Sequence, residues 1–370
     1  MKVLYLGHYK ENSGWSRAAI DQILAMDSSG IDIVCRNIKL TNKQSVLPER
    51  ILELENKDIG DATHCIQCVL PHCIVGSSLF KKNVAYFFGE SLSLKRNAWH
   101  YYLSLVDEIW VPNNDSNKFL SPLLKNPIKT VPQAMDTGKY EKDYQELEFD
   151  MLDGSYKFYF LGDLNDRKNL ETTIRCYYQS FTASDPVSLW VKVKQYGKTS
   201  EELSQYCKKL CVKIQKEMRI YASGKSYPSI KFITSDFSDD VIYSFHKFCD
   251  CFVNLSHGEA WSIPSFDAMC LGNHPICSNE GGPKMYIDPT DKNSGTLIDG
   301  TYTICNEQNG AFSHLFTGNE YWFVPNEKEV SEAMRYYFET KNTVNEVDKE
   351  KIDNFSYKKI GKLMGEMLNE

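Results

Sequence analysis

The stretch Cys251–Asp267, CFVNLSHGEAWSIPSFD, passes from an apolar run into a small polar loop and then into the start of a helix. The run Cys251–Leu255 predicts a buried strand, and Pro264 is typical of a first helical turn. In open parallel sheets, ligands bind beyond the carboxyl ends of the strands, so the loop after this strand is a candidate site. Glu259 and Asp267 are eight positions apart, about two helical turns. They could accept hydrogen bonds from the hydroxyls of a polyol, or they could simply be solvated.

The same alternation of apolar runs and amphipathic helical stretches continues in both directions from this segment, which predicts an α/β fold with parallel sheets covered by helices. In the first half the expected strands are Val3–Leu6, Ile31–Asn37, Thr63–Cys68, Val84–Phe88, Glu108–Val111 and Lys129–Val131. In the second half they are Phe158–Leu161, Leu189–Val193, Ile230–Ile233, Cys251–Leu255, His274–Cys277 and Tyr321–Val324. The sequence therefore predicts two Rossmann-like, doubly wound domains.

A length of 370 residues also favours two domains. The acidic stretch Tyr140–Ser155 carries no strand pattern and reads as a linker. We expect an N-terminal domain over residues 1–150 and a C-terminal domain over residues 151–345. Helical spacing recurs in Val330–Lys341 and Tyr357–Leu368, and we expect residues 346–370 to pack back on the N-terminal domain.

Two other loops follow expected strands. The loop His8–Arg17 contains Gly14 and Ser16, small residues that would let backbone N–H groups approach an anion at a helix start, although a tight turn explains them equally well. The loop Gly162–Asn169 contains Arg167 and Lys168 near its end. Two cations at a helix start oppose the helix dipole, so an anionic ligand explains them better than a solvated turn does.

Composition narrows the class of protein. The net charge of −7 disfavours a broad nucleic-acid surface. The chain begins with a strand pattern and lacks an apolar run of ~20 residues, so we expect a cytoplasmic protein with reduced thiols. A zinc site is a weak alternative, because its four candidate ligands fall within nine residues: Cys65, Cys68, His72 and Cys73.

The run Gly258–Gly272, GEAWSIPSFDAMCLG, together with Gly281-Gly282-Pro283, resembles the signature of retaining GT-B glycosyltransferases of family four. That pattern is E-G-F-G-L-P-x-x-E-A-M-A-x-G, and this chain departs from it with Trp261 and with Asp267 at the second acid. The resemblance implies a GT-B fold whose C-terminal domain binds a nucleotide-sugar donor and whose N-terminal domain faces the acceptor.

The resemblance also assigns roles to individual residues. Glu259 would contact the donor sugar and Asp267 the ribose, while Arg167 and Lys168 would bind the diphosphate. The remaining donor-binding residues that the resemblance implies are Gly14 and Ser16 in the first loop and Ser262, Ile263 and Pro264 in the motif.

The acceptor-side residue is less clearly marked. Where the family often has a histidine after the fourth strand, this sequence reads G-E-S, which makes Glu90 the candidate catalytic residue; His72 is the rival. No Asp-x-Asp pair suits a divalent ion, and Asp239-Asp240 reads as a helix cap. We therefore expect a transferase that needs neither metal nor cofactor, and the resemblance implies that it retains the anomeric configuration.

Two alternatives keep the fold and change the reaction. One is a phage-type enzyme that glycosylates modified DNA bases, which the acidic balance disfavours. The other is a sugar-nucleotide epimerase or a non-catalytic binding module. The expected partners are a nucleotide sugar and a carbohydrate or other hydroxyl acceptor; the sequence leaves the sugar, the nucleotide and the oligomeric state open.

Overall fold

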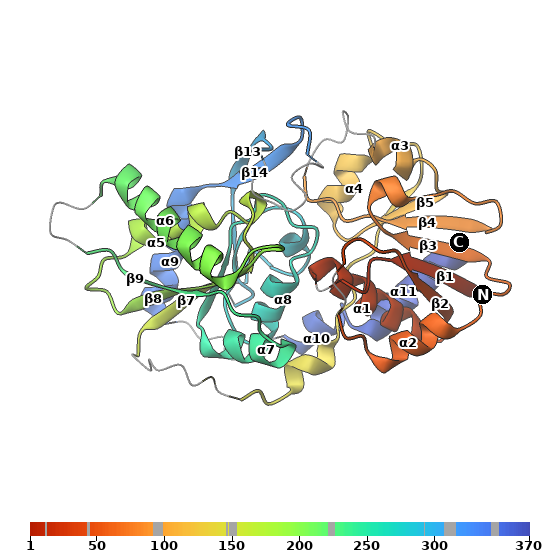
Figure 1. The fold of residues 1–370 in the computed structure, drawn as a ribbon, viewed down its shortest axis with the longest axis horizontal. Helices are drawn as coiled ribbons and strands as arrows, with labels where there is room; N and C mark the ends of the chain where they lie inside the picture. Colours follow the sequence, from red (N-terminus) through yellow and green to blue (C-terminus); the bar gives the residue numbers. More distant parts are fainter. Residues whose placement is uncertain are drawn as a thin grey trace. The chain divides into compact units, whose positions relative to one another are not determined.

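The computed structural model describes residues 1–11, 13–42, 45–91, 99–145, 147, 154–220, 226–291, 293–306, 316–341 and 348–370. The chain forms two compact units (Figure 1). The first unit comprises Met1–Glu141 and Asp348–Glu370, and the second comprises Lys142–Val347. Most of the segment that we expected as a linker falls at this boundary, and its residues 146 and 148–153 lie outside the described part.

The first unit contains a six-stranded sheet with the order β2-β1-β3-β4-β5-β6, and every neighbouring pair is parallel. The strands are β1 Lys2–Gly7, β2 Asp32–Asn37, β3 His64–Cys68, β4 Lys82–Tyr86, β5 Glu108–Val111 and β6 Ile128–Thr130. The helices are α1 Gly14–Ser28, α2 Glu49–Asn56, α3 Trp99–Leu103, α4 Asn114–Leu120, α10 Lys349–Asp353 and α11 Tyr357–Asn369, with 3-10 turns η1 Pro71–Cys73 and η2 Thr137–Glu141. Since β1 pairs with both β2 and β3, the chain reverses direction across the sheet at β1.

The second unit repeats the plan with the order β12-β11-β10-β7-β8-β9, again parallel throughout. Its strands are β7 Tyr156–Asp163, β8 Val187–Lys194, β9 Ser229–Ile233, β10 Cys251–Asn254, β11 Ile276–Ser278 and β12 Thr296–Ile298. Its helices are α5 Leu170–Ser180, α6 Ser200–Met218, α7 Asp239–Phe248, α8 Ile263–Cys270 and α9 Glu327–Thr340, with 3-10 turns η3 Asp166–Lys168 and η4 Gly282–Met285. These two sheets confirm the predicted α/β fold of two Rossmann-like halves.

One expected strand lies elsewhere. We expected Tyr321–Val324 among the strands of the second half, but β14 Tyr321–Pro325 pairs antiparallel with β13 Gly300–Ile304 in a separate two-stranded sheet. The sheet edge is occupied instead by β12, a three-residue strand whose sequence we did not recognise. Such a short strand carries too few residues to show a periodicity.

The helices of the second unit lie on both faces of its sheet (Figure 1). One face packs against α5, α6 and α9, and the other packs against α7 and α8. The cap of α7 is Ser238, whose hydroxyl accepts from Val241 N, so Asp239 and Asp240 occupy the first helical turn rather than the cap position. Both carboxylates there are favourable toward the helix dipole.

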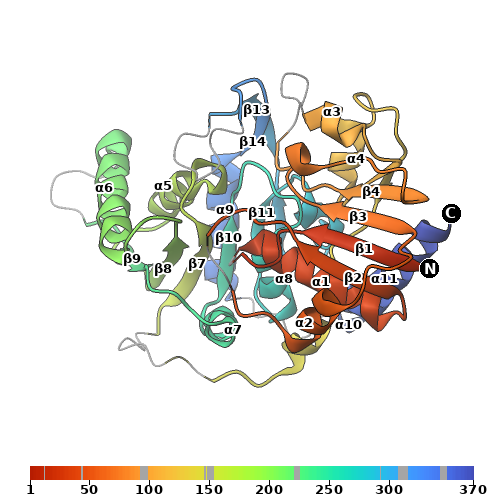
Figure 2. The same cartoon turned by 45° about the vertical axis from the view of Figure 1, so that its right-hand side comes forward.

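The C-terminal helix belongs to the core of the first unit. Ile360, Met364 and Leu368 on α11 are buried in the same apolar cluster as residues of α1 and β1, and Figure 2 shows the helix beside them. Tyr357 donates a hydrogen bond to Asp21 Oδ1 on α1 at 2.6 Å. At the crossing, a Cβ on Gly361 would lie 2.0 Å from the Ala25 carbonyl oxygen, so only glycine permits this approach.

Candidate active site

The loop after β7 carries the two cations. Asn165 caps the short turn η3 by accepting from Lys168 N at 2.9 Å. Asn169 then takes a left-handed conformation, φ 55°, and donates to the Leu255 carbonyl beyond β10 at 2.9 Å. Because β7 and β10 are paired neighbours, these bonds hold Arg167 and Lys168 at the carboxyl edge of the sheet, next to the loop that follows β10.

Glu259 in that second loop meets both cations. Its Oε1 lies 2.5 Å from Lys168 Nζ, and its Oε2 lies 3.7 Å from Arg167 Nη1. Arg167 Nη1 also donates to the Gly258 carbonyl at 2.7 Å. The structure therefore brings together three residues that we had proposed from separate motifs.

The electrostatics of this triad favour an anion. Glu259 is only 7% exposed; burial by itself raises the pKa of its carboxyl, but Lys168 and Arg167 outweigh burial and hold the pKa below its ordinary value. The carboxylate is thus ionised at neutral pH and compensates one of two neighbouring positive charges. An anionic group placed beside Arg167 and Lys168 would balance the other.

The loop that carries Glu259 is held by a buried hydroxyl network. Asn254 at the end of β10 donates to Ser262 Oγ at 2.7 Å and to Ser265 Oγ at 3.0 Å, and it accepts from Ser256 Oγ at 2.6 Å. Ser262 caps α8 with φ 67°, a left-handed conformation that favours glycine. Its hydroxyl makes no capping bond to α8 but bonds Asn254 and Ser265, which gives Ser262 a structural role beside any contact with a ligand.

The Gly281-Gly282-Pro283 segment packs directly on the same loop. A Cβ on Gly282 would lie 2.2 Å from both Cα and O of Trp261. Gly282 N donates to the Glu259 carbonyl at 2.9 Å, and the Tyr286 hydroxyl donates to the Trp261 and Ser262 carbonyls at 3.1 Å each. The close approach of Gly282 and its hydrogen bond to the Glu259 carbonyl together hold the backbone of Glu259 in place.

The other motif residues lie on α8. Pro264 is in the first turn, as expected, next to Ile263. Asp267 is in the second turn and only 4% exposed. The assignment of Asp267 to a ribose remains a prediction.

His257 is a residue of this site that we did not single out from the sequence. Its ring stacks on Trp322 of β14 with centroids 5.0 Å apart, and its Nδ1 bonds the Phe323 carbonyl at 2.7 Å. Its backbone N donates to the Arg167 carbonyl at 2.8 Å. Burial lowers the pKa of His257, so the ring is neutral at pH 7. The position stood in the candidate loop, but no local pattern indicates that β14 passes beside it.

The first-unit candidates lie at the carboxyl edge of the first sheet. Gly14 begins α1, and a Cβ there would meet nothing within 4 Å. The hydroxyl of Ser16 is buried and donates to the Tyr9 carbonyl at 2.6 Å, which closes the loop after β1. His72 is exposed in η1 after β3, and the half-buried Glu90 follows β4. Because β3 and β4 are neighbours, both acceptor-side candidates leave the sheet at the same edge.

The zinc alternative does not fit the strand geometry. Cys65 and Cys68 point to opposite faces of β3, since Cys65 packs with Leu4 and Val34 while Cys68 packs with Tyr5 and Tyr86. Within the described ranges, no group of three or more His, Cys, Asp or Glu residues could hold a metal ion.

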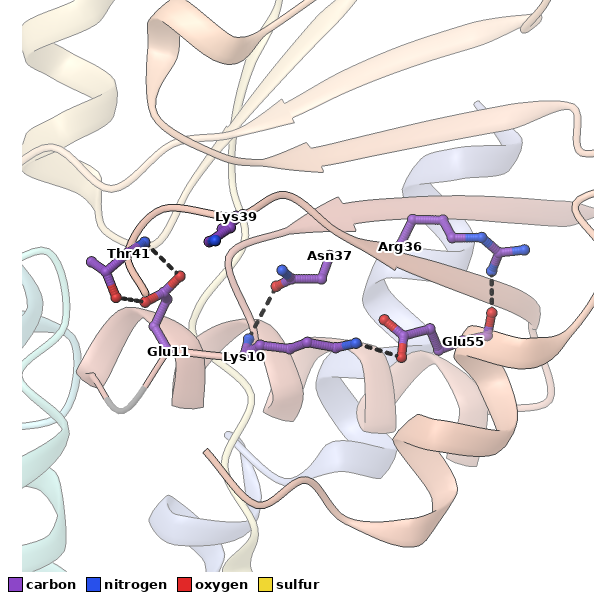
Figure 3. A pocket seen from close by; sticks show the side chains of 7 residues that line it. All are labelled: Lys10, Glu11, Arg36, Asn37, Lys39, Thr41 and Glu55. Carbon is purple, nitrogen blue, oxygen red and sulfur yellow. Dashed lines mark hydrogen bonds and ion pairs between the residues drawn. The ribbon is translucent and has the colours of Figure 1, made fainter. Parts of the chain in front are cut away.

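A pocket of about 280 Å³ opens at the carboxyl ends of β1 and β2 (Figure 3). Lys10 Nζ forms an ion pair with Glu55 Oε2 at 2.8 Å, and the Arg36 guanidinium donates to the carbonyls of Glu55 and Lys57 at the C-terminal end of α2. Glu11 accepts from the backbone N–H groups of Leu40 and Thr41. The lining residues are Lys10, Glu11, Arg36, Asn37, Lys39, Thr41 and Glu55. Three cationic side chains face two carboxylates in this lining, which suits a ligand rich in oxygen.

Among the helices of the described residues, none has the length and apolar content needed to cross a membrane.

Comparison with known proteins gives a fold and no close relative. No family model and no curated protein sequence matches the chain. Among solved structures, the sucrose-phosphate synthase of Thermosynechococcus elongatus aligns with 100% of this chain and 98% of its own, at a TM-score of 0.68 and 11% identity. Anabaena HepE in complex with UDP and glucose aligns with 100% of this chain and 99% of its own, at a TM-score of 0.66 and 12% identity. A glycosyltransferase of Rickettsia africae aligns with 99% of this chain and 97% of its own, at a TM-score of 0.63 and 11% identity. The chain thus has the two-domain GT-B fold of these proteins.

Proposed function

We propose that this protein is a glycosyltransferase that moves a sugar from a nucleotide-sugar donor to a hydroxyl acceptor. The observation that carries the proposal is the triad of Arg167, Lys168 and Glu259 at the carboxyl edge of the second sheet. Two cations beside a buried, ionised carboxylate match a ligand that combines a diphosphate with a polyol. The structural likeness to sucrose-phosphate synthase and to HepE bound to UDP and glucose supports the same class of reaction.

The triad assigns roles in the bond-breaking step. Arg167 and Lys168 would stabilise the negative charge that develops on the diphosphate as the bond between the anomeric carbon and the phosphate oxygen breaks. Glu259 would accept hydrogen bonds from hydroxyls of the donor sugar. Asp267 would bind the ribose, and the first turn of α8, with Ile263 and Pro264, would line the same site.

We further propose that the reaction retains the anomeric configuration and proceeds without a metal. In such a step, the acceptor oxygen attacks the anomeric carbon from the face that the phosphate leaves, and its proton passes to a phosphate oxygen. The two side-chain cations supply the positive charge that a divalent ion would otherwise provide.

The acceptor would bind at the first unit. Glu90 is the proposed acceptor-side residue, with His72 as its rival, and the Gly14 loop would approach the donor phosphates. The pocket at β1 and β2 adds oxygen-binding side chains to this edge, because Lys39 and Asn37 line it beside Lys10.

The test starts from UDP-glucose, with which HepE has also been solved. We expect nucleotide sugar to bind the full chain in calorimetry with a chelator present, and Lys168→Met and Glu259→Gln to weaken this binding at least tenfold. The exposed Lys216→Met, near the C-terminal end of α6, serves as the control and should bind as the wild type does. NMR of the product formed with an added acceptor sugar then reports the anomeric configuration.

Unchanged binding in both site variants would refute the donor site. An inverted product would refute retention while leaving the transfer intact. A need for divalent metal in turnover would refute the metal-independent mechanism.

A further inference from the structure

Lys192 on β8 is a buried lysine at the ligand-binding edge of the second sheet. Its side chain is only 4% exposed. It points to the same face as Trp190, which packs with residues of α7 and α8, whereas Val191 and Val193 point to the opposite core. In register it pairs with Leu161 of β7 and with Ile233, the last residue of β9, so it lies close to the carboxyl edge.

The ammonium group of Lys192 lacks the partners that a buried charge normally has. In the part of the chain that the structure describes, its Nζ makes no hydrogen bond and no ion pair, and it lies over the Phe237 ring, 5.4 Å from the centroid. Burial lowers its pKa, Lys194 lowers it further, and Asp236 and Asp163 oppose the shift. Burying a charge in this way costs free energy unless something compensates it.

The tip of Lys192 is nevertheless within reach of a ligand. Among the described residues, some side-chain polar atoms are fully enclosed and have no hydrogen-bond partner, such as the indole nitrogen of Trp322. Lys192 Nζ is not one of these enclosed atoms, so solvent still touches it. A lysine with a buried stem, and with a tip that solvent touches and that makes no hydrogen bond to the described residues, is poised to donate to a ligand.

The order of the strands indicates which part of a donor reaches Lys192. Glu259 follows β10, Arg167 and Lys168 follow β7, and Lys192 lies on β8, in the sheet order β10-β7-β8-β9. Neighbouring strands are ~4.8 Å apart. With the sugar at Glu259 and the diphosphate at Lys168, the nucleoside end of the donor continues along the edge toward β8. This step rests on the proposed function.

We propose that Lys192 is a specificity-determining residue that donates a hydrogen bond to an exocyclic carbonyl oxygen of the donor nucleobase. An ammonium group is a donor only, so it favours an acceptor oxygen on the base. Uracil, thymine and guanine carry such an oxygen, whereas adenine carries an amino group at the corresponding edge. The site therefore selects donors with a keto base and disfavours adenosine diphosphate sugars.

Calorimetric titration of the full chain with UDP, GDP and ADP tests this selection. We expect the wild type to bind UDP or GDP at least tenfold more tightly than ADP, because a hydrogen bond to a charged group is lost with ADP. Lys192→Met should weaken the preferred nucleotide about tenfold or more and leave ADP nearly unchanged, so that the ratio collapses. Lys192→Gln retains a hydrogen-bond donor, so its ratio of affinities should lie between those of the wild type and Lys192→Met.

The matched control is Lys231→Met. Lys231 lies on the neighbouring strand β9, on the same face, with its Nζ over the Trp190 ring at 5.5 Å, but two residues further from the carboxyl edge. It should leave all three affinities unchanged. Thermal denaturation without nucleotide checks folding, and Lys192→Met should be at least as stable as the wild type, since an uncompensated buried charge is removed.

Two results would overturn the role of Lys192: a wild type that binds ADP as tightly as UDP and GDP, or a Lys192→Met variant that keeps the wild-type ratio. If Lys168→Met still abolishes nucleotide binding in those cases, the donor site stands and only the base contact is wrong. If the wild type binds neither the nucleotides nor a nucleotide sugar, the proposed function fails together with it.

Discussion

At the scale of single residues, the donor site depends on one buried carboxylate between two cations. Glu259 is ionised because Lys168 and Arg167 hold its pKa low against the opposing effect of burial. Its side chain therefore stabilises the folded site before any ligand arrives. Removing its charge would leave two positive charges facing each other at the edge of the sheet.

We expect Glu259→Gln to lower the free energy of unfolding by about 3 kcal/mol at pH 7, because it removes one partner of a buried ion pair. Since the folded-state pKa of Glu259 lies below its unfolded value, its contribution is present above the unfolded pKa and is lost as pH falls through the folded pKa. Urea unfolding from pH 7 down to pH 3 should therefore show the difference between wild type and variant shrinking with acid. A difference that stays constant with pH would show that Glu259 has the same pKa in the folded and unfolded states, so that the two cations do not stabilise its charge.

The left-handed conformation of Ser262 gives a second prediction at this scale. Ser262→Ala should destabilise the protein by about 1–3 kcal/mol, because the Asn254 amide loses a partner while the positive φ remains. Ser262→Gly loses the same hydroxyl but relieves the backbone, so it should cost less than alanine does. Equilibrium unfolding of both variants provides the measurement, and a glycine variant less stable than the alanine variant would contradict the assignment of strain.

At the scale of secondary-structure elements, the crossing of α1 and α11 holds the C-terminal segment in the first unit. Gly361 allows the two helices to approach until the Ala25 carbonyl is almost in contact with the facing backbone. We expect Gly361→Ala to destabilise the first unit by about 3 kcal/mol, at the upper end for an overpacked core. Gly365→Ala, one turn later on the same helix, meets only the end of the Ile31 side chain at 3.3 Å and should cost far less. Denaturant unfolding, with hydrogen exchange of α11 amides, compares the two variants. Equal effects of the two substitutions would show that the crossing adds no steric cost at Gly361, since helix propensity alone favours alanine at both positions.

The same helix pair contains a titrating group. Asp21 on α1 is buried beside Tyr357, and burial raises its pKa to about 6 despite the opposing effects of Lys139 and Arg17. A carboxyl with a raised pKa contributes stability below its unfolded pKa of about 3.9 and loses that contribution as pH rises through its folded pKa. We therefore compare the free energy of unfolding of the wild type with that of Asp21→Asn. The wild-type value minus the variant value should fall by about 2–3 kcal/mol between pH 4 and pH 7.

Thermal denaturation across this pH range measures the difference directly. Asp21→Asn retains an oxygen that accepts from the Tyr357 hydroxyl, so the helix contact itself survives. A difference independent of pH would mean that the carboxyl titrates normally in the folded state.

At the scale of the whole molecule, the two units have separate cores, and the first is assembled from both ends of the chain. Truncation after Val347 would expose the partners of Ile360, Met364 and Leu368 in the first unit but remove nothing from the second. We expect the truncated chain to lose most protection in β1 and α1 by hydrogen exchange. Nucleotide binding should weaken but persist, because Arg167, Lys168 and Glu259 all lie in the second unit and only the proposed contribution of the Gly14 loop would be lost. Complete loss of nucleotide binding on truncation would contradict the central role of these three residues.

The sequence by itself determined the elements that have a strong local signal. Long parallel strands such as β7 and β8 are buried on both faces and therefore appear as nearly continuous apolar runs, and the loops after β7 and β10 stood out because charges follow those runs directly. The sequence could predict only that Lys168 and Glu259 lie at the same edge of the sheet. It could not predict their ion pair, since 91 positions separate them in the chain.

Tertiary structure decided what no local pattern encodes. Only the folded chain shows that β14 pairs outside the parallel sheet and stacks Trp322 on His257, and that Gly361 lies at a helix crossing. It also shows that Lys192 is buried with no hydrogen bond or ion pair to any other described residue. These features depend on which segments, distant in sequence, meet in the fold. The burial, the contact distances and the neighbouring charges of a residue are set by those other segments, so its own local sequence cannot indicate them.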